Sequence, residues 1–219
     1  NKAYEVGNQY GVLASDYLSA AAAFTRAGYR EQAEDLAELS SKMQIAGQVS
    51  ADVANQMLIA TDKAYAYNGS ITELSSVMDK MTVIDHNYAT SVEKIADGMG
   101  IVAPVAKQAN MSIDELIASL GTITAVTQRS GTEAARALRA LILSIIKDTT
   151  TELDDGVTWT VEEINSVQDA LKMYAPEVVK AAEATGKLID PMEAIAALAK
   201  SYEDGLLTEA KLAQLTSSL

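Results

Sequence analysis

The chain lacks cysteine altogether and has few prolines and aromatic residues. Without a cysteine among its 219 residues, it can form neither a disulfide nor a thiolate metal site. Three prolines leave room for long helices, and an aromatic content of 5% supplies few of the residues that favour β-strands. Apolar residues, chiefly helix-favouring types such as Ala and Leu, still make up 48% of the chain, which argues against disorder. The composition predicts an all-α protein with a hydrophobic core.

The chain has no excess of positive charge, and its formal net charge is −13. A protein that grips phosphate backbones needs a local cluster of Lys and Arg, and four residues come closest to one. They are Arg129, Arg136, Arg139 and Lys147. Arg136 and Arg139 are spaced to share one helix face, which we interpret as a solvated surface. We therefore expect no direct contact with nucleic acid.

The chain also lacks a membrane-spanning run and a signal peptide. Its longest central uncharged segment, 116–128, is shorter than the roughly 20 residues that a membrane helix needs. Because the chain begins at Asn1 rather than Met and stops at Leu219 inside a helical pattern, we expect it to be an excised fragment. Any membrane contact would then belong to the full-length protein.

Predicted helix starts are marked by capping boxes, in which an N-cap oxygen and a carboxylate three residues later satisfy each other's backbone amides. The last of them also has Pro191 at the first helical position, where a missing N–H costs nothing. The five boxes pair Ser70 with Glu73, Thr90 with Glu93, Ser112 with Glu115, Thr160 with Glu163, and Asp190 with Glu193. Predicted helix ends lie at Gly28, Gly47, Asn68 with Gly69, Asn110, Gly131, Gly186 and Gly205.

Between these marks the apolar residues recur at helical spacing. The pattern predicts about ten helices joined by short turns, which favours an antiparallel multi-helix bundle of helical hairpins. Pro104 removes a backbone donor, so we expect a kink or break near 101–103. The segments 15–60 and 91–143 share an order of helices and turns, which leaves open an internal duplication.

The helical pattern is interrupted most clearly at the segment 148–159. Its threonines disfavour helix, Asp154, Asp155 and Gly156 form a turn signal, and Trp159 precedes the predicted cap at Thr160. We therefore predict a helical domain at 1–147, a linker at 148–159 and a smaller helical unit at 160–219.

Residues able to support catalysis or metal binding are sparse. His86 is the only histidine, and although Asp85 lies beside it, no nucleophile motif accompanies the pair. We interpret His86 as a surface or capping residue. The acidic run Glu152, Asp154 and Asp155 lacks the spacing of a calcium loop, and we interpret it as solvated.

Two further patterns have ordinary structural explanations. Residues 98–103 match the loose dinucleotide pattern G-x-G-x-x-A, but they lie in a predicted helix rather than between a strand and a helix, so we expect packing glycines. Most methionines fall on apolar stripes and predict core filling. They include Met57, Met78, Met81, Met111 and Met192. We predict no catalytic, cofactor-binding or metal-binding residues, and no enzyme activity.

Four groups of residues, the landmarks of this sequence, follow one another in a fixed order and spacing over about residues 10–147. They are Phe24 to Tyr29, Asp85 with Asn87 before Ser91 to Glu93, Ser112 with Asp114 to Leu116, and Thr127 to Gly131 followed by Ala137 with Leu138. In this order and spacing, more than in any single group, the chain resembles the core region of phage tail tape measure proteins. The chain departs from the family pattern at Gln128, where a second basic residue is common, and in its longer 148–159 segment.

The resemblance implies a structural virion protein, of a phage or prophage, that occupies the tail lumen. Such a protein organises tube assembly, fixes tail length and leaves ahead of the DNA. It implies the tail tube protein, tail assembly chaperones and baseplate or tail-tip proteins as partners, leaves self-association open, and places the protein in the virion tail after assembly in the host cytoplasm. The alternatives are a general α-helical adaptor and an enzyme, which would require a pocket joining His86 to convergent carboxylates.

Overall fold

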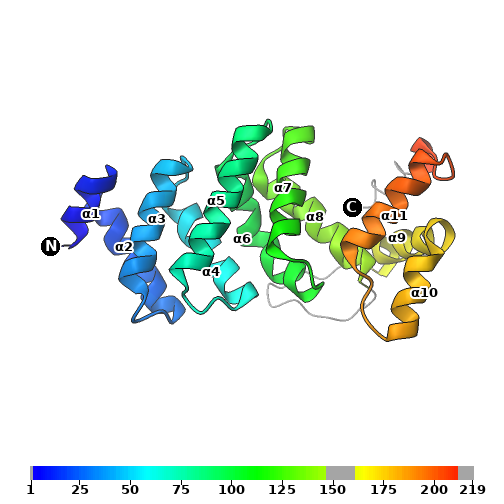
Figure 1. Cartoon of the computed structure of the whole chain (residues 1–219), viewed down its shortest axis with the longest axis horizontal. Coiled ribbons are helices and arrows are strands. Elements are labelled where there is room, and N and C mark those ends of the chain that lie inside the picture. The colour runs from blue at the N-terminus through cyan, green and yellow to red at the C-terminus, as the bar shows by residue number, and fades with distance from the viewer. Residues whose placement is uncertain (1, 147–160, 212–219) are drawn as a thin grey trace. The chain divides into compact units, whose positions relative to one another are not determined.

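The described residues form an all-α bundle, as predicted. The computed structural model describes residues 2–146 and 161–211, with side chains from Val167 onward in the second range. Eleven helices lie within these residues, more than the ten or so predicted (Figure 1). They are α1 (Lys2–Tyr10), α2 (Ala14–Ala27), α3 (Ala33–Ala46), α4 (Ala51–Tyr65), α5 (Ile71–Asn87), α6 (Val92–Gln108), α7 (Ile113–Thr127), α8 (Gly131–Ile145), α9 (Val161–Tyr174), α10 (Pro176–Thr185) and α11 (Pro191–Glu203).

Contacts divide the chain into two compact units. The first contains Asn1–Lys107 and Ser112–Arg136, and the second contains Gln108–Met111 and the chain from Ala137 onward. Within the first unit α1 packs on α3, α3 on α5 and α5 on α7, so that the odd-numbered helices lie side by side in order (Figure 1). The even-numbered helix α4 packs on α2 in the same way.

Alternate helices of the first unit run in the same direction. Lys2 at the start of α1 contacts Asp35 at the start of α3, while Ala89 just after α5 accepts a hydrogen bond from Gln128 just after α7. Consecutive helices are joined by turns of three to five residues and reverse direction, as the predicted hairpins require. The result is a stack in which the odd-numbered and even-numbered helices form two series.

The core of the first unit is built from alanines and flexible side chains rather than aromatic rings. Phe24 is fully buried there, and so are two of the methionines predicted for the core, Met57 and Met81; a third, Met111, is buried in the second unit. Met78 and Met192 are only half-buried. Small alanines let neighbouring helices approach, and unbranched methionine fills the gaps that such a core leaves.

Serine side chains cap five successive helices. The Oγ atoms of Ser50, Ser70, Ser91, Ser112 and Ser130 each accept a hydrogen bond from the backbone N–H three residues later. The capping box at Ser112 with Glu115 is complete, as predicted. A reciprocal pair that was not predicted joins Ser130 and Glu133, although its Ser-x-x-Glu spacing was visible in the sequence.

Three other predicted caps have three different outcomes: one is wrong, one is confirmed and one lies outside the described side chains. The cap of α6 is Ser91 rather than Thr90, because the Thr90 hydroxyl lies 2.6 Å from that of Thr124 on α7. Asp190 caps α11 as predicted, accepting hydrogen bonds from the backbone N–H groups of Met192 and Glu193. The predicted pair at Thr160 and Glu163 lies outside the residues whose side chains the structure describes.

The predicted helix end at Gly131 is wrong. Helix α7 ends on Gln128, in the left-handed conformation with φ 56°, and Gly131 is the first residue of α8. Gly28, by contrast, ends α2 as predicted with φ 107°. Glycine is needed at 131 for space rather than for backbone freedom. A Cβ atom there would lie 2.0 Å from the Lys94 carbonyl oxygen of α6.

Of the kink or break predicted near 101–103, the break does not occur. Helix α6 continues from Val92 to Gln108 with Pro104 inside it. Val102, Ala103, Val105 and Ala106 on either side are buried, so their packing holds the helix together. Pro104 itself is exposed, which leaves the carbonyl that it cannot bond open to water.

The second unit begins within α8. Ile145 of α8 joins Val167, Leu171 and Ala175 of the α9 region in one core cluster, together with Ile189 and Ala194 around the start of α11. This packing explains why the contacts divide before the predicted linker. The linker segment 148–159 lies outside the described residues, and the predicted domain boundaries stay a prediction.

Replacing Gly131 by Ala should destabilise the first unit by about 3 kcal/mol, because the added methyl overlaps backbone that cannot move aside. Gly100→Ala is the matched control, since its Cβ would meet nothing nearer than 4.0 Å, and Ala at a helix interior gains up to about 1 kcal/mol over Gly. Urea unfolding of both variants measures the difference. Equal midpoints for Gly131→Ala and the parent would contradict the packing argument.

Candidate functional site

The residues considered for catalysis do not converge on a pocket. His86 is exposed on α5, and its Nδ1 lies 2.7 Å from the Thr82 carbonyl oxygen one turn earlier. This is the contact of a histidine that satisfies its own helix. Among the described residues no group of three or more His, Cys, Asp or Glu side chains is placed to hold a metal ion. The acidic run at 152–155 lies outside them.

Of the two glycines in the pattern at 98–103, Gly98 serves close helix packing, as expected, whereas a Cβ atom on Gly100 would meet nothing nearer than 4.0 Å. The residues of the pattern lie in the middle of α6, where no helix N-terminus faces a ligand. A Cβ on Gly98 would lie 2.9 Å from Leu120 Cδ2 and 3.1 Å from the Gly131 carbonyl oxygen. Gly98 therefore lets α6 approach both α7 and α8.

The two arginines predicted to share a solvated face differ in burial. Arg136 is exposed, but Arg139 is only 6% exposed. The prediction was wrong for Arg139 because α8 is covered on several sides in its second half, where Leu138, Ala140 and Ile142 are also buried. Lys147 lies outside the described residues. Of the four predicted basic residues, the described ones therefore leave only Arg129 and Arg136 on the surface, fewer than a site for phosphate backbones needs.

The structure instead brings together polar side chains about one helical hairpin apart. Four direct contacts of aspartate side chains join helices, or the turns beside them, that are next-but-one in the chain. They are Lys2 with Asp35, Tyr29 with Asp62, Lys80 with Asp114, and Thr132 with Asp97. Each links groups 33 to 35 residues apart in sequence. These contacts fix how far one hairpin slides along the next.

Asp62 lies at the centre of the most buried of these contacts. The residue is 3% exposed, and its carboxylate accepts hydrogen bonds from the Tyr29 hydroxyl at 2.5 Å and from the Gly69 backbone N–H at 2.7 Å. Tyr29 follows α2, Asp62 lies in the last turn of α4, and Gly69 precedes α5. One side chain thus ties three helices and their turns.

The local sequence explains how Tyr29 reaches Asp62. Gly28 turns the chain out of α2, and its neighbour Tyr29 then points across to α4 with its ring edge against Phe24, at a centroid distance of 6.5 Å. Burial raises the pKa of Tyr29, and the hydrogen bond to the Asp62 carboxylate raises it further. The Phe24 to Tyr29 landmark is therefore a packing and turn element.

The landmark at 127–131 has the same character. Gln128 stands in the left-handed conformation that ends α7, and its Nε2 donates to the carbonyl oxygens of Ala89 at 2.9 Å and Ala125 at 2.6 Å. A hydrogen bond from the Ser130 hydroxyl lowers the pKa of the exposed Glu133 carboxyl. Gly131 completes the turn by its close approach to α6.

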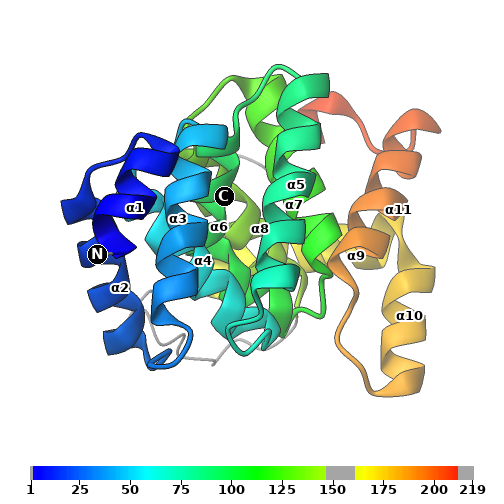
Figure 2. The ribbon, with the colours of Figure 1, turned by 60° about the vertical axis from the view of Figure 1, so that its left-hand side comes forward.

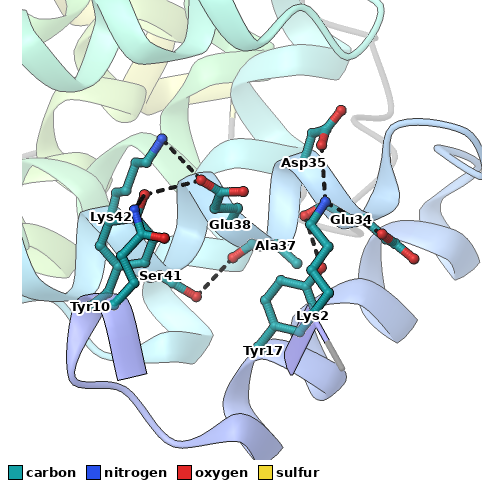
Figure 3. A network of polar contacts seen from close by, with 10 residues as sticks. Lys2, Tyr10, Tyr17, Glu34, Asp35, Ala37, Glu38, Ser41 and Lys42 are labelled. Carbon is teal, nitrogen blue, oxygen red and sulfur yellow. Dashed lines mark hydrogen bonds and ion pairs between the residues drawn. The ribbon is translucent and has the colours of Figure 1, made fainter. Parts of the chain in front are cut away.

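An exposed polar network joins α1 to α3 at the start of the stack (Figure 3). Lys2 lies 3.3 Å from both Glu34 and Asp35, and the Tyr10 hydroxyl donates to Glu38 at 3.0 Å. Lys42 forms an ion pair with Glu38 one turn away on the same helix. Exposed pairs of this kind each contribute only about 0–1 kcal/mol, so they direct the docking of α1 more than they stabilise it.

The described helices carry their polar groups in caps, turns and contacts between hairpins, which is the design of a structural protein built from stacked helical hairpins. None of these helices is long and apolar enough to cross a membrane. The whole chain, residues 1–219, matches the family described as phage-related minor tail proteins, and the chain belongs to that family. No curated protein and no solved structure matches it. Membership makes it a structural component of the phage tail, points to a non-enzymatic role, and implies contact with other tail components in general.

Tyr29→Phe should lower the free energy of unfolding by about 1–3 kcal/mol, because it leaves the buried Asp62 carboxylate without its side-chain donor. Tyr65→Phe is a matched control, since the buried Tyr65 hydroxyl has no hydrogen-bond partner among the described residues. That variant should stay within about 0.5 kcal/mol of the parent. Urea unfolding at neutral pH distinguishes the two, and equal losses would contradict a special role for Asp62.

Stability should also fall above about pH 10, where an unfolded tyrosine ionises. Burial raises the pKa of both Tyr29 and Tyr65, so the folded chain keeps protons that the unfolded chain has lost. Their contribution is complete below about pH 10 and is lost as the pH rises toward the folded values. The double variant Tyr29→Phe, Tyr65→Phe should therefore lose less stability on going from about pH 9 to about pH 11. Parallel losses in parent and variant would refute this.

Proposed function

We propose that this chain is part of a tail tape measure protein, which fixes tail length and tube assembly from within the lumen and leaves ahead of the DNA. The observation that carries the proposal is the match of the whole chain to the minor tail family, joined to the ordered landmarks of the sequence. Those landmarks lie at helix ends and close contacts, as the Tyr29 and Gly131 regions illustrate. A family whose task is architectural would keep such positions.

Charge supports a place in the lumen. The formal net charge of −13 gives a surface that repels a polyanion, so DNA passing through the same tube would not adhere. A lumen protein must fill space without trapping the genome. The exposed Arg129 and Arg136 lie close to Glu133, which limits the reach of their positive charge.

The form of the helices supports a compact module attached to a ruler rather than the ruler itself. An extended helix advances about 1.5 Å per residue, so an uninterrupted one converts chain length into distance. Here every helix within the described residues spans 9 to 17 residues and then folds back. In our proposal this segment packs at one end of the protein, and the length-measuring helices lie elsewhere in the full chain.

The second candidate function is a general helical adaptor. It is favoured by large apolar side chains that remain exposed at the turns of the stack, among them Tyr88 at 64% and Val126 at 77%. Such side chains are the usual anchors of protein–protein contacts. The two functions predict different effects of deletions in the protein on tail length: a tape measure protein should change it, and an adaptor should not.

In the phage that encodes this chain, in-frame deletions in the extended part of the protein should shorten the tail by about 1.5 Å per deleted residue. Gly131→Ala in the present segment should reduce the yield of tails without changing their length, because it destabilises a folded module. Electron microscopy of purified tails measures both effects. A tail length unaffected by deletions anywhere in the protein would reject the tape measure role and favour the adaptor.

A further inference from the structure

The topology of the first unit places four turns on one edge of the stack. Because alternate helices run parallel, the turns α1–α2, α3–α4, α5–α6 and α7–α8 all lie at the same end of their helices. The turns that close α5 and α7 can be followed at one end of the stack in Figures 1 and 2. The α2–α3, α4–α5 and α6–α7 turns lie at the opposite end.

Each of the four turns, or the last helical turn before it, exposes one large apolar side chain: Leu13 and Tyr88 lie in the turns themselves, and Ile45 and Val126 near the ends of α3 and α7. Together they define the apolar edge: Leu13 (68% exposed), Ile45 (52%), Tyr88 (64%) and Val126 (77%). On the opposite edge one comparable side chain is exposed among the described residues, Tyr4 at 65% in the first turn of α1, while Tyr29 and Tyr67 are half-buried and Met111 is buried. Single exposed apolar residues are ordinary, but one at every turn of the same edge is a periodic surface.

The charges beside the apolar edge are mostly negative. Carboxylates stand in the first turn of all four helices that begin there, and Asp85 lies in the last turn of α5. The four are Asp16, Asp52, Glu93 and Glu133. The cations in the same turns are Arg129, which is exposed, and Lys94, which is half-buried. A partner that covers this edge would therefore gain from positive charge.

The spacing of the turns suits a helix. Helices packed side by side lie about 8–10 Å apart, so successive anchors of the apolar edge recur at about that interval. Two turns of an α-helix, or seven residues, advance about 10.5 Å. A partner helix that lies across the edge can thus place one apolar residue, every seventh along its chain, against each of the four side chains. Contacting all four would take a helix of about 20 residues.

We propose that the apolar edge is the docking surface for an amphipathic helix of another protein, with apolar residues at heptad spacing and Lys or Arg flanking them. The charge of the edge favours such a basic helix over the other possible occupants. A second copy of this chain would bring carboxylates against carboxylates, and an anionic lipid surface would be repelled by the same groups.

The test uses the 219-residue chain and a synthetic 22-residue peptide. The peptide has leucine at the first and fourth positions of each heptad and lysine at the other positions. Calorimetry measures its affinity, and circular dichroism measures the helix that the peptide gains. The edge variant Leu13→Ser, Ile45→Ser, Tyr88→Ser, Val126→Ser should bind about tenfold or more weakly. The matched control changes four exposed apolar residues of the second unit to serine, namely Met173, Leu188, Tyr202 and Leu206, and should bind as the parent does.

A peptide with glutamate in place of lysine should bind at least about tenfold more weakly than the lysine peptide to the parent chain, which tests the charge argument. Circular dichroism of the edge variant confirms that it is folded, since the substituted side chains are exposed. Equal affinity of edge and control variants for the lysine peptide would overturn the proposal. Two other results would also overturn it. One is that the parent and control proteins sediment as dimers while the edge variant is a monomer. The other is that the parent and control proteins bind anionic vesicles while the edge variant does not.

Discussion

The close approach of helices within each series of the stack is the constraint on which the rest of the first unit depends. At three places this approach leaves no room for a side chain: at Gly98 of α6, where a Cβ atom would lie 3.1 Å from the Gly131 carbonyl oxygen of α8, at Gly121 of α7 against Ile84 of α5, and at Gly131 of α8 against the Lys94 backbone of α6. Packing at this distance brings many atoms into dispersion contact, so that a core poor in aromatic rings can still be dense. It also leaves each hairpin only one sliding position relative to the next.

Polar contacts then refine a position that packing has already chosen. The exposed pairs of Lys2 and Lys80 each contribute about 0–1 kcal/mol, which is too little to hold helices together but enough to favour one register. Asp62 is the exception, because its carboxylate is buried and would be costly to leave without donors. The stack therefore has an apolar basis throughout and one buried polar tie between α2, α4 and α5.

Most helices could be located from the sequence because their ends are determined by residues close to them in the chain. Serine with Glu three residues on at 112–115, and glycine at 28, each act within one turn. Gly131 was misassigned because the deciding partner, the Lys94 carbonyl oxygen on α6, is distant in sequence. The break considered at Pro104 does not occur, because the residues on either side of it are buried. The alignment of Leu13, Ile45, Tyr88 and Val126 could not be read from the sequence, since these residues become neighbours only through the parallel order of alternate helices.

This locality also bears on the mechanical role proposed for the protein. The specific contacts of the first unit join residues about one hairpin apart, so each hairpin depends chiefly on its immediate neighbours, as in repeat proteins. Helices of 9 to 17 residues are marginal when isolated in water, so a hairpin that loses its neighbour loses most of its stability. Such a stack can open from an end one hairpin at a time and can re-form by the same short-range contacts. A globular core built from distant segments would instead have to unfold all at once, which suits a protein confined to a narrow tube less well.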